Sequence, residues 1–135
     1  FYRTYETADG RYVAVGAIEP QFYAQLLAGL GLSADALPSQ MDRSSFPAMH
    51  TLFAERFATK TRDQWTAVFA GSDACVTPVL TWSEAARSDH LRARETLVTR
   101  HGADQAAPAP RFSRTPPNPV GAPPEGATPV DRIDW

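Results

Sequence analysis

The chain has 135 residues, enough for one domain with a hydrophobic core, and its 15 acidic and 13 basic side chains give a net charge of −2. Acids and bases are interspersed, which argues against a surface for nucleic acid or an anionic membrane. No apolar run approaches the roughly 20 residues that a transmembrane helix requires, so we expect neither a nucleic-acid nor a membrane partner.

The cysteine and histidine residues indicate neither an internal disulfide nor a metal site. Cys75 is the only cysteine, and the 3 histidines show no metal-ligand spacing. The chain does not begin with Met and carries no signal peptide, so we expect it to be a piece of a longer protein. Nearly all of its basic residues are arginine and alanine is abundant, which suits a GC-rich bacterial genome and a cytoplasmic protein.

Residues 1–18 are predicted to form a β-hairpin. Aromatic and β-branched residues fill 1–7 and 11–15, and Ala8-Asp9-Gly10 supplies the turn; Asp-Gly between two such runs is a strong hairpin signal. Residues 20–31 predict a helix that Gly31 ends, with an apolar face formed by Phe22, Leu26, Leu27 and Leu30.

Two further helices are predicted before residue 71. The first follows Ser44-Ser45, whose hydroxyls we expect to cap it, and presents Met49, Leu52, Phe53, Arg56 and Phe57 at helical spacing. The second opens with a Thr61-x-x-Gln64 capping box and ends at Gly71. Its inward-facing residues are predicted to be Trp65, Val68 and Phe69.

Residues 74–80 form a short apolar segment whose Pro78 allows only an edge or interrupted strand. Thr81-x-x-Glu84 is another capping box, and it opens a helix that we expect to break near Ser88-Asp89. Residues 96–100 are predicted to return as a last strand.

The composition changes near residue 104, because 8 of the 12 prolines lie between Pro108 and Pro129. Such a segment is not expected to form helix or sheet, and we expect an extended arm over 104–135 or, taken alone, a disordered tail. Its apolar anchors would be Phe112, Ile133 and Trp135. The expected fold is therefore α+β. A small domain (1–103) would pack three to five helices on a small antiparallel sheet, which is made of the N-terminal hairpin and one later strand. The extended arm (104–135) would follow this domain.

One carboxylate stands at the junction between the predicted hairpin and the first helix. Glu19 precedes Pro20, and proline at the first helical position pushes the residue before it out of the α region, so Glu19 falls at or near the N-cap. Its side chain is one methylene too long to cap well. A purely structural role stays open, because a negative charge here gains about 0.3–1 kcal/mol from the helix dipole.

Two stretches carry a resemblance to a known family. The first covers 1–23, where Gly-Ala-Ile-Glu-Pro-Gln-Phe-Tyr at 16–23 is the specific part, and the second is Gly-Ser-Asp-Ala-Cys-Val-Thr-Pro-Val-Leu-Thr at 71–81. Together they resemble the α-methylacyl-CoA racemases of the class III CoA-transferase family, in their bacterial, mycobacterial-type form. The resemblance covers about residues 1–100, and a similar Pro-rich tail follows.

The resemblance implies an interlocked homodimer of two-domain subunits. A large α/β domain, expected to be absent from this chain, would carry the CoA contacts, a catalytic histidine and a catalytic aspartate. Glu19 corresponds to the glutamate that pairs with this histidine across the domain cleft, and we expect Gly16, Ala17 and Ile18 beside it to bind substrate. The CoA thioester is itself the substrate, so no cofactor is expected, and this chain alone is expected to be inactive.

The implied reaction interconverts (R)- and (S)-2-methylacyl-CoA in fatty-acid metabolism. A proton leaves the carbon next to the carbonyl and returns to the other face of an enolate, so each face needs an acid/base group. A histidine serves one face only when a hydrogen bond fixes its tautomer. A carboxylate can provide that bond and stabilise the imidazolium, which is the role that we expect for Glu19.

Other candidate residues have simpler structural explanations. Asp73 could face the cleft, but a turn is the expected role. Cys75 has no basic neighbour in sequence and is expected to be buried as a small hydrophobe. Solvated polar or terminal helix positions are expected for His50, His90 and His101.

Aromatic residues of the hairpin leave two interpretations open. An acyl pocket could be lined by Tyr2, Tyr5 and Tyr12, although packing within the hairpin is the favoured alternative. Core packing is expected for Met49, Phe53 and Phe57.

Two other functions stay open. A class III CoA-transferase moves CoA between carboxylic acids through an acyl-enzyme carboxylate. Those enzymes favour a Gly-rich loop where this chain has Ala17-Ile18-Glu19, so the racemase is favoured. A non-catalytic α+β interaction module is the non-enzyme alternative, against which the missing initial Met argues.

Overall fold

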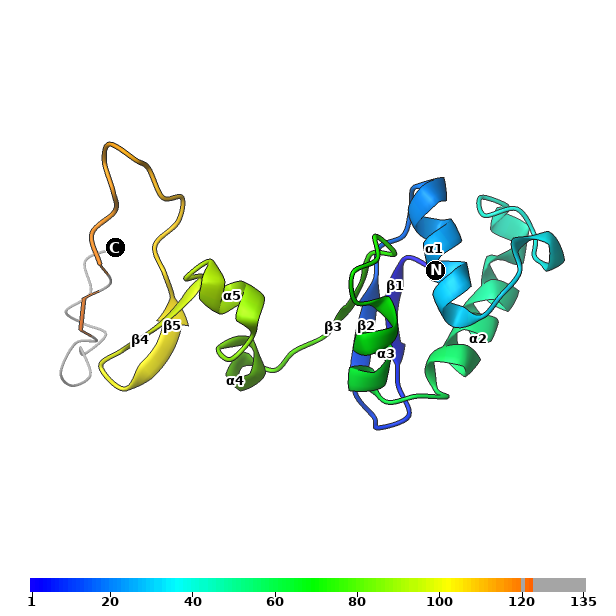
Figure 1. The fold of residues 1–135 in the computed structure, drawn as a ribbon, viewed down its shortest axis with the longest axis horizontal. Coiled ribbons are helices and arrows are strands. Elements are labelled where there is room, and N and C mark those ends of the chain that lie inside the picture. The colour runs from blue at the N-terminus through cyan, green and yellow to red at the C-terminus, as the bar shows by residue number, and fades with distance from the viewer. Residues whose placement is uncertain (120, 123–135) are drawn as a thin grey trace, which may run out of the picture. The chain divides into compact units, whose positions relative to one another are not determined.

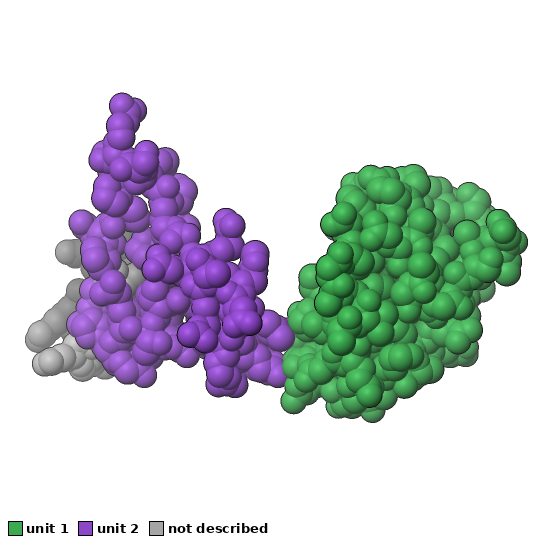
Figure 2. Space-filling view, viewed as in Figure 1, with its two compact units in different colours: residues 1–79 green, residues 80–135 purple. Residues whose placement is uncertain are grey.

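The structure, a computed structural model, describes residues 1–119, 121 and 122. The chain divides into two compact units, residues 1–79 (unit 1) and residues 80–135 (unit 2) (Figure 2). Within the described residues there are five α-helices, one three-stranded sheet and one two-stranded sheet, all antiparallel. The predicted α+β class is confirmed, and so is a sheet made of the hairpin and one later strand.

Unit 1 contains the three-stranded sheet, in the order β1 (Arg3–Glu6), β2 (Tyr12–Val15) and β3 (Val76–Pro78) (Figure 1). The predicted hairpin is confirmed: Tyr5 pairs with Val13, and Gly10 turns the chain with a φ of +70°, which glycine adopts without strain. β3 pairs with β2 alone, so Pro78 lies on an edge strand, as predicted.

Three helices pack with this sheet: α1 (Pro20–Leu30), α2 (Phe46–Phe57) and α3 (Arg62–Phe69). Two short 3-10 turns, Ala34–Ala36 and Arg43–Ser45, lie between α1 and α2. Sheet and helices share one core, whose largest fully buried side chains are Trp65, Phe53, Phe57, Leu26 and Val13. The predicted core role of Met49, Phe53 and Phe57 is confirmed.

The ends of α1 and α3 follow the sequence signals. Gly31 ends α1 in the left-handed region (φ +68°), and the Thr61–Gln64 capping box opens α3 with both of its hydrogen bonds. Val68 was predicted to face inward and does not, since it is 44% exposed. The buried stripe of α3 runs through Arg62, Trp65 and Phe69, and Val68 lies about 100° around the helix from Phe69.

Ser45 is the N-cap residue of α2, but the prediction that a serine hydroxyl caps this helix is wrong. α2 begins at Phe46 as expected, but the Ser45 hydroxyl donates to the Asp42 carbonyl (2.8 Å) and the Ser44 hydroxyl donates to Asp42 Oδ1 (2.6 Å). Asp42 opens the 3-10 turn before α2, and this turn uses both hydroxyls.

Unit 2 contains α4 (Trp82–Ala85), α5 (Asp89–Ala93), β4 (Leu97–Arg100) and β5 (Ala103–Ala106). The Thr81–Glu84 capping box opens α4, and the predicted break is confirmed because Ser88 is the N-cap of a separate α5. The predicted strand at 96–100 is confirmed as β4, which pairs with β5.

The expectation that no sheet forms from residue 104 onward is wrong for residues 104–106, which belong to β5. His101 and Gly102 both adopt positive φ, +53° and +77°, and reverse the chain into a hairpin before the prolines begin. Phe112, one of the expected apolar anchors of the arm, is 59% exposed on this chain. Ile133 and Trp135 lie outside the described residues, and the division into 1–103 and 104–135 stays a prediction.

Candidate functional site

Glu19 lies between β2 and α1 and is the N-cap residue of α1, as predicted. Its carbonyl oxygen accepts hydrogen bonds from the N–H groups of Phe22 (3.0 Å) and Tyr23 (2.9 Å). Its side chain does not cap the helix and is exposed. Among the described residues, the Glu19 carboxylate accepts no hydrogen bond and forms no ion pair. The backbone is therefore anchored while the carboxylate stays available to a group from elsewhere.

The three residues before Glu19 are also held in place. Gly16 N donates to the carbonyl of Cys75 (2.8 Å), and Gln40 Nε2 donates to the carbonyls of Ile18 (2.9 Å) and Ala17 (3.3 Å). The Ala17 side chain is fully buried, whereas Ile18 is 49% exposed. Ile18 is thus the one of the three that presents a side chain at the surface, and their role in substrate binding stays a prediction.

A groove of about 430 Å³ crosses the sheet face opposite the core. Its lining includes Thr4, Ala14 and Thr77, which face one another across the three strands, and the exposed ring of Tyr2. The groove reaches Gly16, three residues before Glu19. A surface of small side chains with one aromatic ring therefore adjoins the segment that carries the candidate carboxylate.

The three hairpin tyrosines have different environments. Tyr5 is 2% exposed and stacks on Phe57 of α2 with ring centroids 5.0 Å apart, so it packs in the core between sheet and helix rather than within the hairpin alone. Burial raises the pKa of Tyr5 to about 12, and its hydroxyl is the one buried side-chain polar atom of the described residues without a hydrogen bond. Tyr2 and Tyr12 are exposed, and only Tyr2 lines the groove.

The expectation that Cys75 is buried is wrong. Its φ of +52° and the bond from Gly16 N to its carbonyl direct the neighbouring Ala74 into the core, and the thiol is exposed. Asp73 lies in the loop before β3, where its N–H donates to Gln25 Oε1 (2.8 Å) and its side chain is exposed. The turn role expected for Asp73 stays a prediction.

The three histidines do not meet in one site. His50 on α2 is half-buried beside Tyr5, and this burial, with smaller contributions from the Arg3 and amino-terminal charges, lowers its pKa. His90 is exposed on α5 as expected, but His101 lies in the turn between β4 and β5 and not on a helix.

The part of the chain that the structure describes contains no group of three or more metal-binding side chains and no helix long and apolar enough to cross a membrane.

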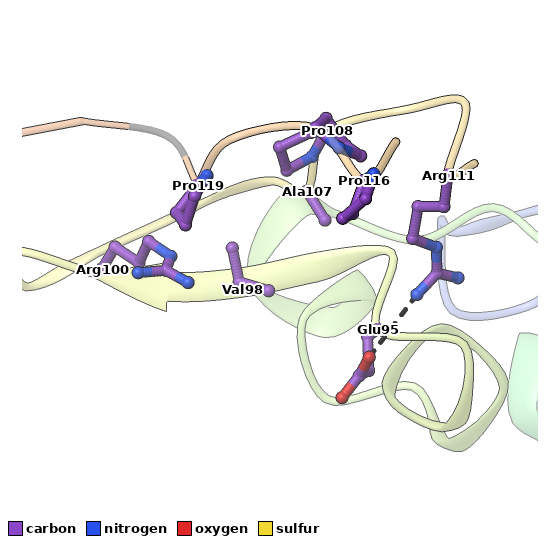
Figure 3. Close-up of a pocket in the computed structure, with 9 residues that line it drawn as sticks. Glu95, Val98, Arg100, Ala107, Pro108, Arg111, Pro116 and Pro119 are labelled. Carbon is purple, nitrogen blue, oxygen red and sulfur yellow. Dashed lines mark hydrogen bonds and ion pairs between the residues drawn. The ribbon is translucent and has the colours of Figure 1, made fainter. Parts of the chain in front are cut away.

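A separate cavity of about 240 Å³ lies in unit 2, between the β4–β5 hairpin and the segment after it (Figure 3). Arg111 reaches across it to Glu95 (3.5 Å) and to the carbonyl of Arg94 (2.6 Å). Prolines from 108 to 119 form much of the remaining wall. None of the residues predicted to be functional lines this cavity.

The sequence predicted the N-cap position of Glu19 but gave no indication of Gln40, whose amide bonds the backbone just before it. Gln40 lies in the irregular connection between α1 and α2, 22 residues after the carbonyl that it contacts. Neither a motif nor a periodicity marks it, because its role depends on how the chain folds back on itself.

The family model of CoA-transferase family III matches residues 1–128. The chain is 54% identical over 117 residues to alpha-methylacyl-CoA racemase of Mus musculus and 50% identical over 117 residues to that of Homo sapiens. Each match covers 86% of this chain and 31% of the relative, so the chain spans about a third of the racemases' length. It is also 42% identical over 82 residues to CaiB/baiF CoA-transferase family protein ZK892.4 of Caenorhabditis elegans, covering 58% of this chain and 22% of that protein.

Two crystal structures of Rv3272 from Mycobacterium tuberculosis are similar in fold. A mutant form superposes with a TM-score of 0.62 at 18% identity, covering 88% of this chain and 37% of that one. The orthorhombic form gives a TM-score of 0.62 at 16% identity, with 84% and 33% covered. At these identities the similarity concerns the fold alone. The family match, which spans almost the whole sequence, shows that the chain belongs to CoA-transferase family III.

Proposed function

We propose that this chain is the part of an α-methylacyl-CoA racemase that supplies Glu19 to the active site. The complete protein would interconvert (R)- and (S)-2-methylacyl-CoA by removing the α-proton and returning it to the other face of the enolate. Identities of 54% and 50% to two mammalian racemases support this proposal. A large domain with a histidine, an aspartate and the CoA contacts would lie in the rest of the protein, in an interlocked homodimer.

The observation that carries the proposal is the state of the Glu19 carboxylate. It is exposed and has no partner among the described residues, although the backbone on both sides of it is fixed by hydrogen bonds. A merely capping residue would bond to the helix N–H groups, and this side chain does not. A carboxylate held in this way is suited to receive a group from a second domain.

The chemical role follows from the reaction. The Glu19 carboxylate would accept a hydrogen bond from one imidazole nitrogen, so that the other nitrogen faces the substrate in the correct tautomer. Once the imidazole takes the α-proton, the negative charge stabilises the imidazolium. This interaction strengthens as the proton moves, so it lowers the barrier more than it improves substrate binding.

A family III CoA-transferase is the second candidate function. One relative, from Caenorhabditis elegans, is described as a CoA-transferase family protein. The Ala17-Ile18-Glu19 sequence differs from the Gly-rich loop expected of those transferases, which favours the racemase. We further propose that the protein acts in fatty-acid metabolism in the cytoplasm of a bacterium and needs no cofactor beyond its CoA thioester substrate.

Deuterium exchange tests this proposal. The full-length protein that contains this chain is incubated with (R)-2-methylacyl-CoA in heavy water. A racemase incorporates deuterium at C2 and forms the S epimer without any acceptor acid. A requirement for a free carboxylic acid, with transfer of CoA to it and no exchange at C2, would establish the transferase and contradict the racemase.

A further inference from the structure

The carboxamide of Gln40 bridges the connection between α1 and α2 to the segment that carries Glu19. Its Nε2 lies 2.9 Å from the carbonyl oxygen of Ile18 and 3.3 Å from that of Ala17. A primary amide nitrogen carries two N–H donors, so it can serve both carbonyls at once. The amide oxygen could not take this place, because it would face two other oxygen atoms.

This contact determines the orientation of the peptide that leads into Glu19. The Ile18 carbonyl belongs to the same peptide plane as the Glu19 N–H, and among the described residues that N–H donates no hydrogen bond. On the other side, the Glu19 carbonyl is held by Phe22 N and Tyr23 N, and Pro20 has no N–H to give. Gln40 is therefore the one described side chain that hydrogen-bonds the backbone of residues 17–19.

The Gln40 segment packs against the core through Leu37, but its contact with α1 is incomplete. A cavity of about 260 Å³ lies between this segment and α1, with Pro20, Tyr23 and Leu37 among its walls. Gln40 itself is half-buried, and its bond to the Ala17 carbonyl is partly buried whereas its bond to the Ile18 carbonyl is exposed. The specific attachment between the segment and the Glu19 backbone is thus the pair of amide bonds.

We propose that Gln40 is a positioning residue for Glu19: its two hydrogen bonds hold the Ile18–Glu19 peptide so that the carboxylate points away from unit 1 toward its partner. This inference rests on the proposed function of Glu19. A displacement of a catalytic group by about 1 Å can reduce the rate roughly 10²-fold, so a loss of this attachment is expected to be visible in kcat.

The test uses the full-length protein and the variant Gln40→Met, which keeps the length of the side chain and removes both donors. We expect kcat for exchange at C2 to fall by about 10- to 100-fold with KM within about threefold of wild type. The acidic limb of the pH profile should also move, because a displaced carboxylate favours the imidazolium less. Gln40→Lys retains a donor of similar reach and should recover most of the lost kcat.

Gln64→Met is the matched control. Gln64 also hydrogen-bonds the backbone, accepting from Thr61 N (2.9 Å), but it caps α3. This variant should lower the thermal stability while leaving kcat and the pH profile unchanged. If Gln40→Met does not fold, Gln40→Glu tests the same contact, since it has the same shape and its ionised form has no donor.

A double-mutant cycle separates this inference from the proposed function. If Gln40 acts through Glu19, Gln40→Met has no further effect on kcat in the Glu19→Gln background. Additive losses, or a Gln40→Met variant with wild-type kcat, would overturn the inference while leaving the role of Glu19 intact. Wild-type kcat in Glu19→Gln alone would overturn the proposed role of Glu19, on which this inference rests, while the racemase activity itself is tested by the exchange experiment above.

Discussion

Unit 1 and unit 2 differ in how they are held together. Every buried apolar side chain among the described residues belongs to unit 1, from Tyr5 to Ala74. Unit 2 has exposed polar contacts instead, such as the capping box at Thr81 and the bond from Trp82 Nε1 to the Asp104 carbonyl (3.3 Å). Exposed contacts of this kind contribute little net stability, because water competes for the same groups.

The difference shows what each unit contributes. Unit 1 has its own core and can hold Glu19 on a fixed backbone without help from other domains. Unit 2 contains a two-stranded hairpin and two short helices, and an isolated hairpin is marginal in water. Unit 2 is therefore expected to be the less stable of the two units.

Amide exchange on the 135-residue chain should show the largest contrast. Amides that join β1 to β2 exchange by opening the core, whereas those that join β4 to β5 need only local opening. We expect exchange to be roughly 10³-fold or more slower in the first hairpin. Equal protection in the two hairpins would contradict the comparison.

Truncation of a core ring gives the largest expected change in stability. Phe53 is fully buried and contacts the rings of Tyr5 and Tyr23, so Phe53→Ala should lower the free energy of unfolding of unit 1 by about 3–5 kcal/mol. Trp82→Ala in unit 2 is the control: Trp82 is 57% exposed, and we expect a loss of about 1 kcal/mol or less. Urea denaturation measures both, and similar losses would refute the difference between the units.

Overpacking of the same core should have an intermediate effect. A Cβ added at Gly29 would overlap the ring of Phe69, whereas a Cβ at Gly121 meets no atom within 4 Å. Gly29→Ala should therefore destabilise unit 1 by about 1–3 kcal/mol in spite of the better helix propensity of alanine. Gly121→Ala should leave the urea midpoint unchanged, and an unchanged midpoint in Gly29→Ala would argue that α1 and α3 are loosely packed.

A smaller, pH-dependent effect is expected at the hairpin turn of unit 1. The pKa of Asp9 lies below its ordinary value of 3.8, chiefly because the Thr7 hydroxyl donates a hydrogen bond to its carboxylate (2.6 Å). The Arg62 N–H and the charge of Arg11 also lower this pKa, and burial raises it by less than the Thr7 bond lowers it. The ionised carboxylate therefore stabilises the fold above that pH, and this contribution is lost as the pH falls through the folded-state pKa.

Urea midpoints measured from about pH 6 to about pH 2.5 should accordingly show wild type more stable than Asp9→Asn at the upper end of the range. The urea midpoints of wild type and Asp9→Asn should become equal as the pH decreases. A difference that does not change with pH would show that the Asp9 charge contributes nothing.

Local signals predicted most of the fold because they act within a few residues. Gly31, the capping boxes at Thr61 and Thr81 and the Asp9-Gly10 turn each determine an element boundary by their own hydrogen bonds or backbone freedom. The edge position of β3 followed from Pro78 for the same reason.

The features that could not be predicted depend on contacts between distant residues. Cys75 is exposed, and its carbonyl accepts from the N–H of Gly16, almost 60 residues earlier. Val68 is exposed while the charged Arg62 belongs to the buried stripe of α3, where its guanidinium donates to the Val79 carbonyl (3.1 Å). At the site, the sequence predicted Glu19 at the N-cap, but the anchoring of its backbone by Gln40 required the structure.

The central claim is that the Glu19 carboxylate acts in catalysis, and kcat of Glu19→Gln in the full-length protein, measured against pH, tests it most directly. Glutamine has the same shape, so folding should be nearly unchanged, while kcat should fall by about 10²–10⁴-fold with little change in KM. The acidic limb of the profile should move to lower pH, because a neutral amide no longer favours the imidazolium. A kcat within about twofold of wild type over the whole profile would reduce Glu19 to a charge at a helix terminus.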